Sequence, residues 1–173
     1  MGRQTEQPGE PGPTDDRPAP WLSADEQATW RAFLLASHHI DATMDRQLQH
    51  DSSMTHSHYG ILVALSEAPD RSLRMTELAN HLYYSQSRTT HAVARLERSG
   101  WVRRQPCPTD GRGQIAVLTD AGMDALVAAA PGHVAHVRAS LFDRLTPQQQ
   151  RDLRAICETI AAGPGATTPG DTA

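Results

Sequence analysis

Apolar residues recur at helical spacing along most of the chain. In the first such segment, large apolar side chains fall at Trp30, Phe33, Leu34, Ile40, Met44 and Leu48. Intervals of three and four residues are typical of one buried face of an α-helix, here about seven turns long. Ser23 and Glu26 have the spacing of a capping box, so we expect the helix to begin beside them.

Shorter apolar patterns predict further helices at residues 55–67, 76–82 and 86–99. Pro69 ends the first of these helices. Ser85 caps the start of the third, and Gly100 ends it. The expected inward residues of the second and third are Leu78, Ala79, Leu82, Thr89, Ala92, Val93 and Leu96. The apolar register after residue 119 continues to residue 145, which predicts one long helix kinked at Pro131. A last helix begins at Thr146, in a second capping box.

The period changes in two short segments. Residues 101–105 and 114–118 are rich in β-forming side chains, and residues 72–75 form a short extended piece. The intervening sequence, QPCPTDGRGQ, holds two prolines and two glycines, so we expect a β-hairpin with a protruding loop. Arg112 lies between the two glycines at the tip of this loop.

The order of these elements predicts the fold. A short helix, a turn, a Ser-capped helix and then a hairpin form a winged helix-turn-helix. We therefore expect a mainly α fold with a small β-hairpin wing, and no internal repeat. Residues 1–20 and 163–173 are rich in Pro and Gly and lack apolar periodicity, which predicts disordered tails around an ordered region at 21–162.

Charge is distributed unevenly along the chain. The 173 residues carry a net charge of −4, and all sixteen basic residues are Arg. Residues 71–115 contain eight Arg and three acidic residues, for +5, which leaves −9 on the remainder. This asymmetry favours a basic binding face on an acidic body over a general nucleic-acid coat protein. The chain lacks a membrane-length apolar run, a signal peptide and a catalytic motif, which predicts a soluble, cytoplasmic non-enzyme without a cofactor.

The helix at 86–99 carries the side chains best suited to nucleic acid. Its expected outward face contains Gln86, Ser87, Arg88, Thr90, His91 and Arg95. Gln and Arg form bidentate contacts with purine edges, and small hydroxyl residues let a phosphate approach a helix N-terminus. The alternative interpretation is a solvated helix face, which the absence of an adjacent acid makes less favourable.

Three segments resemble the MarR family of bacterial winged-helix transcription regulators. They are the L-E-x-x-G-x-V-x-R run from Leu96 to Arg104, the Asp-x-Arg of the loop, and the L-T-x-x-G run from Leu118 to Gly122. The resemblance extends over about 21–162. It implies a homodimer that binds a pseudo-palindromic operator in double-stranded DNA, as a repressor released by a small molecule or an oxidant.

The resemblance and the residue types together give a set of expected DNA contacts. Its members are Arg74, Ser85, Gln86, Ser87, Arg88, Thr90, His91, Arg95, Arg103, Asp110 and Arg112. Arg112 is expected to enter the minor groove, whose negative potential attracts Arg, with Asp110 orienting its guanidinium. Gly111 stands where the family often has a second basic residue. The winged helix-turn-helix spans about 55–118, and the expected dimerisation helices are 23–50 and 119–162. The alternative for these helices is the closed core of a monomer.

The sequence leaves three modes of regulation open. A pocket for a planar, weakly acidic ligand is expected at Trp30, Phe33, His38, Met54 and Tyr59, although core packing is an alternative role for the aromatic residues. A zinc sensor is a second possibility, from the pairs His38-His39, His56-x-His58 and His133-x-x-His136, but no complete ligand set is recognisable. A redox sensor at Cys107, expected to be half-exposed, is a third, with Cys157 expected in packing. A protein-binding winged helix without DNA affinity is the rival class.

Overall fold

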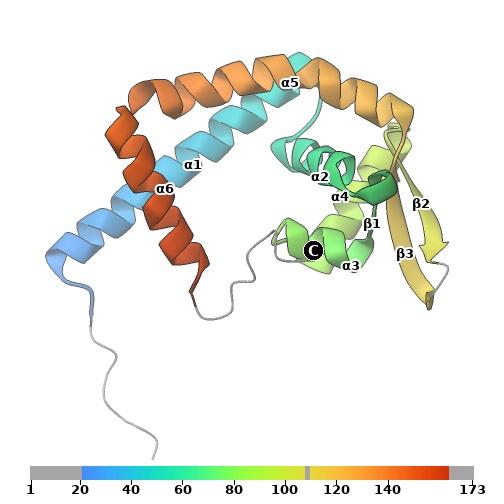
Figure 1. Cartoon of the computed structure of the whole chain (residues 1–173), viewed down its shortest axis with the longest axis horizontal. Helices are drawn as coiled ribbons and strands as arrows, with labels where there is room; N and C mark the ends of the chain where they lie inside the picture. Colours follow the sequence, from blue (N-terminus) through green and yellow to red (C-terminus); the bar gives the residue numbers. More distant parts are fainter. Residues whose placement is uncertain (1–20, 108–109, 164–173) are drawn as a thin grey trace, which may run out of the picture. The chain divides into compact units, whose positions relative to one another are not determined.

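A computed structural model describes residues 21–107 and 110–163, apart from the side chains of 110–112. The helices are α1 (Ala24–Ser52), α2 (His56–Glu67), α3 (Met75–His81), α4 (Gln86–Arg98), α5 (Asp120–Ser140) and α6 (Pro147–Ala161), with short 3₁₀ turns η1 (Pro69–Arg71) and η2 (Phe142–Arg144). The strands are β1 (Ser72–Arg74), β2 (Val102–Cys107) and β3 (Asp110–Leu118) (Figure 1). This confirms the mainly α fold. The tails expected at 1–20 and 163–173 lie outside the described residues, except for Gly163.

The packing divides the chain into two units, of which the first ends at Leu35. The described part of this unit begins at Trp21 and contains the start of α1. Its capping box is formed as predicted, with the Ser23 backbone N donating to Glu26 Oε2 at 2.7 Å and the Glu26 N donating to Ser23 Oγ at 3.2 Å. The rings of Trp30 and Phe33 stack at 5.8 Å between centroids, and each side chain remains 51% exposed.

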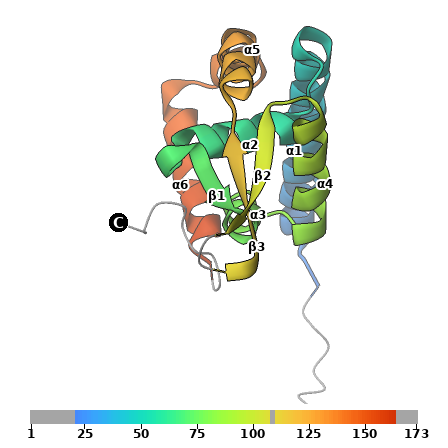
Figure 2. The same cartoon turned by 90° about the vertical axis from the view of Figure 1, so that its right-hand side faces the viewer.

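The second unit begins at Ala36 and contains the winged helix-turn-helix. Its core gathers around α2, where Ile61, Leu62 and Leu65 are fully buried. Figure 2 shows α2 behind the three strands. The α3 and α4 residues predicted to face inward pack against this core: Leu78, Ala79, Thr89, Val93 and Leu96 are buried, and Leu82 and Ala92 are half-buried. The 3.6-residue period therefore predicted the inward faces of both helices of the motif.

The sheet is larger than the sequence indicates. The hairpin is confirmed, but β1 adds a third strand, in the antiparallel order β1-β3-β2, with Ser72 opposite Val117 and Arg74 opposite Ile115. Strands β2 and β3 also continue beyond the predicted segments, as far as Cys107 and Asp110. The loop expected over 105–114 is thus mostly strand. The prolines misled the prediction because Pro is tolerated at strand edges and irregularities, and the register shifts between Pro106 and Cys107.

Helix α5 runs through Pro131 as one helix, as predicted, but it ends at Ser140 and not at residue 145. The Arg144 guanidinium folds back and donates from Nε to the Ala139 carbonyl at 3.0 Å. This bond satisfies one of the carbonyls that a helix end leaves without a partner, which favours the earlier end. The second capping box is confirmed at Thr146 and Gln149. None of the described helices has the length and apolar character needed to cross a bilayer.

A close contact joins the start of α5 to the residue before β2. Thr119 Oγ1 caps α5 by accepting from the Gly122 N at 3.0 Å, and it donates to the Gly100 carbonyl at 2.7 Å. The Thr119 backbone N donates to the Trp101 carbonyl at 3.0 Å. A Cβ atom at Gly122 would lie 2.1 Å from that same carbonyl oxygen. The residue types of the L-T-x-x-G run are therefore explained physically. Thr119 caps the helix, and Gly122 allows two backbone segments to touch.

Replacing Gly122 with Ala is expected to lower the free energy of unfolding by about 3 kcal/mol, because the new methyl group overlaps backbone atoms that have no room to move. Gly60→Ala in α2 is the matched control. Its Cβ would meet Leu82 Cδ2 at 3.8 Å, an ordinary contact, so stability should stay equal or rise by up to about 1 kcal/mol from helix propensity. Urea unfolding followed by circular dichroism measures both, and equal stability of the two variants would contradict the close contact.

Candidate nucleic-acid interface

Helix α4 presents a polar face to solvent. Ser85 caps it by accepting from the Arg88 backbone N at 3.2 Å. The residues predicted to face outward are all exposed: Gln86, Ser87, Arg88, Thr90, His91 and Arg95. Thr90 Oγ1 donates to the Gln86 carbonyl at 2.8 Å, so its hydroxyl is partly occupied by its own helix.

Two open grooves flank this face. The first, about 250 Å³, separates α4 from the start of α3 and from β3, and its polar lining consists of Arg74, Thr76, Gln86, Thr90, Arg104 and Gln114. The second, about 500 Å³, lies between α4 and the start of α2. Its lining consists of Asp45, Thr55, Ser57, His58, Arg88, His91, Ala92, Ala94, Arg95 and Arg98. Three guanidinium groups against one carboxylate make the second groove cationic. Burial and the nearby Arg95 lower the pKa of His58, so that imidazole is neutral at pH 7.

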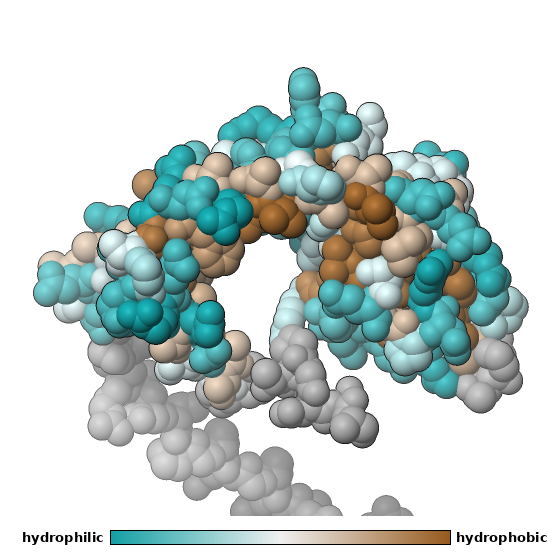
Figure 3. All heavy atoms as spheres, turned by 45° about the horizontal axis from the view of Figure 1, so that its top comes forward, coloured by the Kyte–Doolittle hydropathy of each residue, from teal (hydrophilic) through white to brown (hydrophobic). Residues whose placement is uncertain are grey.

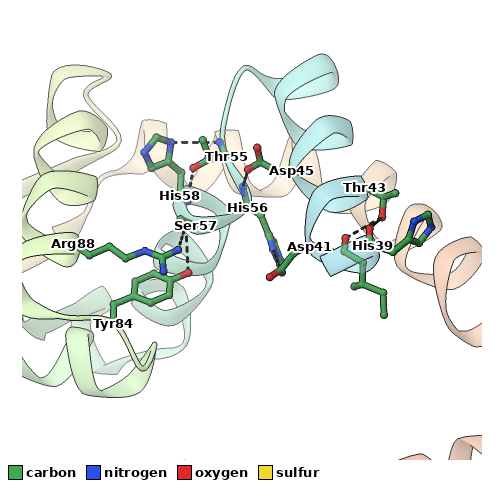
Figure 4. Close-up of polar contacts among 11 residues, drawn as sticks. His39, Asp41, Thr43, Asp45, Thr55, His56, Ser57, His58, Tyr84 and Arg88 are labelled. Carbon is green, nitrogen blue, oxygen red and sulfur yellow. Dashed lines mark hydrogen bonds and ion pairs between the residues drawn. The ribbon is translucent and has the colours of Figure 1, made fainter. Parts of the chain in front are cut away.

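The Arg88 side chain is directed toward the second groove, which His91 and Arg95 also line. Its guanidinium lies over the Tyr84 ring, with Cζ 3.9 Å from the ring centroid. Nη2 of Arg88 donates to Ser57 Oγ at 3.0 Å, and the Tyr84 hydroxyl donates to the same oxygen at 3.4 Å (Figure 4). The sequence predicts Arg88 as a major-groove base contact, together with Gln86, Ser87 and His91, and it does not single out Tyr84 or Ser57.

Charge-assisted hydrogen bonds between Glu97 on α4 and Arg104 on β2 connect α4 to the wing. We call this pair of residues the bracket. Arg104 on β2 donates from Nε and from Nη2 to Glu97 Oε2, at 2.9 and 2.6 Å, and its backbone N donates to Glu97 Oε1 at 3.1 Å. The hydrogen bonds from Arg104 lower the pKa of the Glu97 carboxyl below its ordinary value. Sequence reasoning included both residues in the L-E-x-x-G-x-V-x-R run but assigned neither a role. Their separation of seven residues across a turn gives no periodic signal.

The remaining expected DNA contacts occupy several elements. Arg103 is exposed on β2 and donates from Nη1 to Gln105 Oε1 at 2.7 Å. Arg74, at the end of β1, has its Nε 4.0 Å from Glu77 Oε1, and its backbone N is capped by the same carboxylate. The strand backbone extends to Asp110, but the side chains of Asp110 and Arg112 lie outside the described residues, and so does their expected hydrogen bond.

The residues expected around a ligand do not all line a free surface. Trp30 and Phe33 belong to the first unit, and His38 is exposed in the second. Met54 is 1% exposed and forms part of the core. Tyr59 is buried against the His133 ring, at 4.3 Å between centroids. Core packing is therefore the observed role of Met54 and Tyr59.

The histidine pairs complete no metal site among the described residues, and both cysteines differ from expectation. His133 lies 5.8 Å from His56 between ring centroids, but across the described residues no group of three or more His, Cys, Asp and Glu side chains could hold a metal ion. Cys107 was expected to be half-exposed and is 5% exposed. Strict alternation would turn it away from the face of the buried Val102, five residues earlier, but the register shifts between Pro106 and Cys107 and both residues are buried. Cys157 was expected in packing and is exposed, since the apolar side of α6 is uncovered in the single chain.

The arrangement of α2–α4, the β1-β3-β2 sheet and the basic face of α4 defines a winged helix-turn-helix of the nucleic-acid-binding type. Residues 52–113 match the model of the MarR family. The structure of the MarR family regulator Sco3205 of Streptomyces coelicolor, solved in complex with DNA, is similar with a TM-score of 0.80 and 52% identity, over 86% of this chain and 92% of that one.

A second solved structure supports the same family. AbsC, a MarR family regulator of Streptomyces coelicolor, aligns with a TM-score of 0.77 and 36% identity, over 83% of this chain and 96% of that one. A mutant of Escherichia coli MarR, complexed with operator DNA, shares the fold at 21% identity, with a TM-score of 0.70 over 77% and 93% of the two chains. No curated protein matches the sequence. The chain belongs to the MarR family, whose members are transcription regulators and not enzymes.

Replacing Glu97 with Gln is expected to lower the free energy of unfolding by about 1 kcal/mol near pH 7, because the bracket is half-exposed and loses its charge-assisted bonds. The pKa of Glu97 is lowered by folding, so the stabilisation is present above the ordinary value of 4.5 and disappears as the pH falls through the folded-state pKa. The difference between wild type and variant should therefore shrink below about pH 4.5.

Asp143→Asn supplies the control for this bracket. Its partner Arg138 lies at 2.9 Å, but both side chains are more than half exposed, so the loss should stay below about 0.5 kcal/mol. Chemical unfolding of both variants at pH 4 and pH 7 makes the comparison. A Glu97→Gln effect as small as that of Asp143→Asn at pH 7 would mean that the bracket does not hold the wing.

Proposed function

We propose that this MarR family regulator binds double-stranded DNA with sequence preference, through α4 and the β2-β3 hairpin. The observation that carries the proposal is the exposed face of α4, where base-reading and phosphate-binding side chains gather beside two grooves that contain five different arginines. Its 52%-identical relative Sco3205 was solved in complex with DNA, which supports the same role for this chain. The rival class, a protein-binding winged helix, would need no such cationic grooves.

The surrounding residues suggest a division of roles. Gln86, Ser87 and His91 face solvent on α4 and are the proposed base contacts in the major groove. The proposed phosphate contacts are Arg74, Ser85, Thr90, Arg95 and Arg103. Arg112, near the start of β3, is the proposed minor-groove contact, oriented by Asp110. Arg104 is held by Glu97. We therefore propose that this pair positions β2 and takes no part in recognising DNA.

We also propose that the regulator acts as a homodimer. The helices outside the winged helix-turn-helix expose apolar side chains that a single chain leaves in water: Leu35, Val127, Val134, Phe142, Ile156 and Ile160. Apolar surface, brown in Figure 3, remains visible between the hydrophilic areas. Burial of such surface drives association. A two-fold axis would place two α4 helices about one DNA turn, roughly 34 Å, apart, which requires a pseudo-palindromic operator.

For regulation we propose a repressor that is released by a small molecule, which is the mode typical of the family. The exposed, stacked Trp30 and Phe33 are the aromatic surface that favours a planar ligand. The zinc alternative lacks a ligand set among the described residues, and the redox alternative meets a buried Cys107. We infer a division into dimerisation helices at 23–50 and 119–162 and a winged helix-turn-helix at 55–118.

Selection of random-sequence duplexes by the wild-type protein tests DNA binding directly. The expected product is a pseudo-palindrome whose affinity falls steeply with salt, as counterions leave the phosphates. Retention of no duplex at about 50 mM salt would contradict the proposal and favour the protein-binding class. On the selected duplex, Gln86→Ala should reduce discrimination against a scrambled duplex about tenfold or more, while Arg103→Ala should weaken both duplexes equally.

The dimer is tested by the double variant Ile156→Glu and Ile160→Glu. These side chains are 56% and 64% exposed in the single chain, so charges there should leave the fold intact and abolish association. Light scattering after size-exclusion chromatography should give twice the 18.9 kDa chain mass for wild type and the single mass for the variant. Arg151→Glu, a charge change elsewhere on α6, should remain dimeric. A monomeric wild type would refute the dimer.

A further inference from the structure

We propose that Arg88 and Ser57 together bind one backbone phosphate of the DNA, and that Tyr84 is the positioning residue that holds Arg88 for this contact. The inference rests on the proposed DNA binding and goes beyond it. It moves Arg88 from the base-reading group to the phosphate-binding group, and it adds two residues, from two other elements, to the interface.

The position of each of these three residues is fixed by the turn in which the residue lies. Two residues after α3, Tyr83 lies in the left-handed region, at φ 53°, and the Tyr84 N donates to the Ala79 carbonyl at 2.9 Å. This is the Schellman pattern, and it sets the position of Tyr84. Ser57 lies in the first turn of α2, which is closed by the capping box of Thr55 and His58. Three helix ends therefore converge on one point, since Arg88 lies in the first turn of α4.

The stacking fixes the plane of the guanidinium. Arg88 Cζ lies 3.9 Å from the Tyr84 ring centroid, within the range of a cation–π contact. An exposed Arg otherwise samples many rotamers, and the ordering of a planar fork in advance lowers the entropy lost when it binds a phosphate. Within residues 21–107 and 110–163, Ser57 Oγ is the hydrogen-bond acceptor of this guanidinium. Its other N–H groups are directed to no acceptor there, and they can donate to phosphate oxygens.

The hydroxyl of Ser57 has one donor left. A serine oxygen accepts two hydrogen bonds and donates one. Nη2 of Arg88 donates to Ser57 Oγ at 3.0 Å, and the Tyr84 hydroxyl lies 3.4 Å from the same oxygen. The Ser57 O–H can then donate to an acceptor outside this trio. A phosphate oxygen at the mouth of the second groove would accept from Ser57 and from Arg88 together.

The charge of the second groove agrees with an anionic occupant. Arg88, Arg95 and Arg98 line it, and Asp45 is its one carboxylate among the described lining residues. Asp45 Oδ1 already accepts from the His56 backbone N at 2.9 Å, so part of its charge is engaged. The groove borders α4, and a duplex read by Gln86 and His91 would bring its backbone past this edge. We commit to a DNA phosphate because the groove is open and adjoins the proposed reading face.

The test measures the affinity of the full-length protein for its selected duplex and for a scrambled duplex of equal composition, over a range of salt concentrations. Arg88→Ala should weaken both duplexes by the same factor and reduce the slope of log affinity against log salt by about 0.9 per subunit. Ser57→Ala should weaken both duplexes about tenfold without a change in slope, since it removes a neutral donor.

Variants of Tyr84 separate positioning from folding. Tyr84→Phe keeps the ring and should retain most of the affinity, while Tyr84→Leu should lose about three- to tenfold on both duplexes, with the thermal unfolding midpoint checked for each. Arg138→Ala, remote from both grooves in sequence and paired with Asp143, is the control and should change neither affinity nor slope.

Two results would overturn the inference. The first is a loss of discrimination between the duplexes in Arg88→Ala, which would make Arg88 a base contact. The second is unchanged affinity in both Arg88→Ala and Ser57→Ala. If the wild-type protein binds no duplex at all, the proposed DNA binding itself fails, and that outcome is distinct because it appears before any variant is compared.

Discussion

The attachment of the hairpin to α4 is the constraint on which the interface depends. A winged helix-turn-helix can grip a duplex only if the wing and the reading helix hold one relative position. The Glu97 carboxylate accepts two side-chain hydrogen bonds and one backbone hydrogen bond from Arg104, so it fixes both the side chain and the strand. Immediately before β2, the Trp101 carbonyl lies against Gly122 and accepts from the Thr119 N. These two junctions fix the positions of the basic residues of α4 and β2.

Much of this architecture was readable from the sequence because it follows from local periodicity and from caps. Ser23, Ser85 and Thr146 marked the helix starts correctly, and the inward faces of α3 and α4 matched their apolar positions. The extended piece at 72–75 was predicted, but its pairing was missed because β3 lies about forty residues away, where no local signal exists. Cys107 was misjudged because its two flanking prolines indicated a loop, whereas β2 continues to Cys107 and the register shift after Pro106 leaves the residue buried.

The sequence predicted which residues lie on the exposed face of α4, but it did not predict the role of each residue. Sequence periodicity placed Arg88 on the outer face of α4, and that is where it lies. Its direction depends on Tyr84 and Ser57, which belong to other elements, and a rotamer choice of this kind comes from tertiary contacts. The same limit applies to Met54 and Tyr59. Their residue types suit a ligand pocket, but their burial in the core around α2 is decided by the packing of distant segments.

Hydroxyl-radical footprinting of the selected duplex, bound by the wild-type protein, tests the central claim most directly. A paired set of reading helices, each rigidly coupled to its wing, predicts two equivalent protected regions centred about one helical turn apart, with flanking protection where the wings reach the minor groove. Protection of a single region, or protection that spreads evenly along any duplex regardless of sequence, would contradict the account.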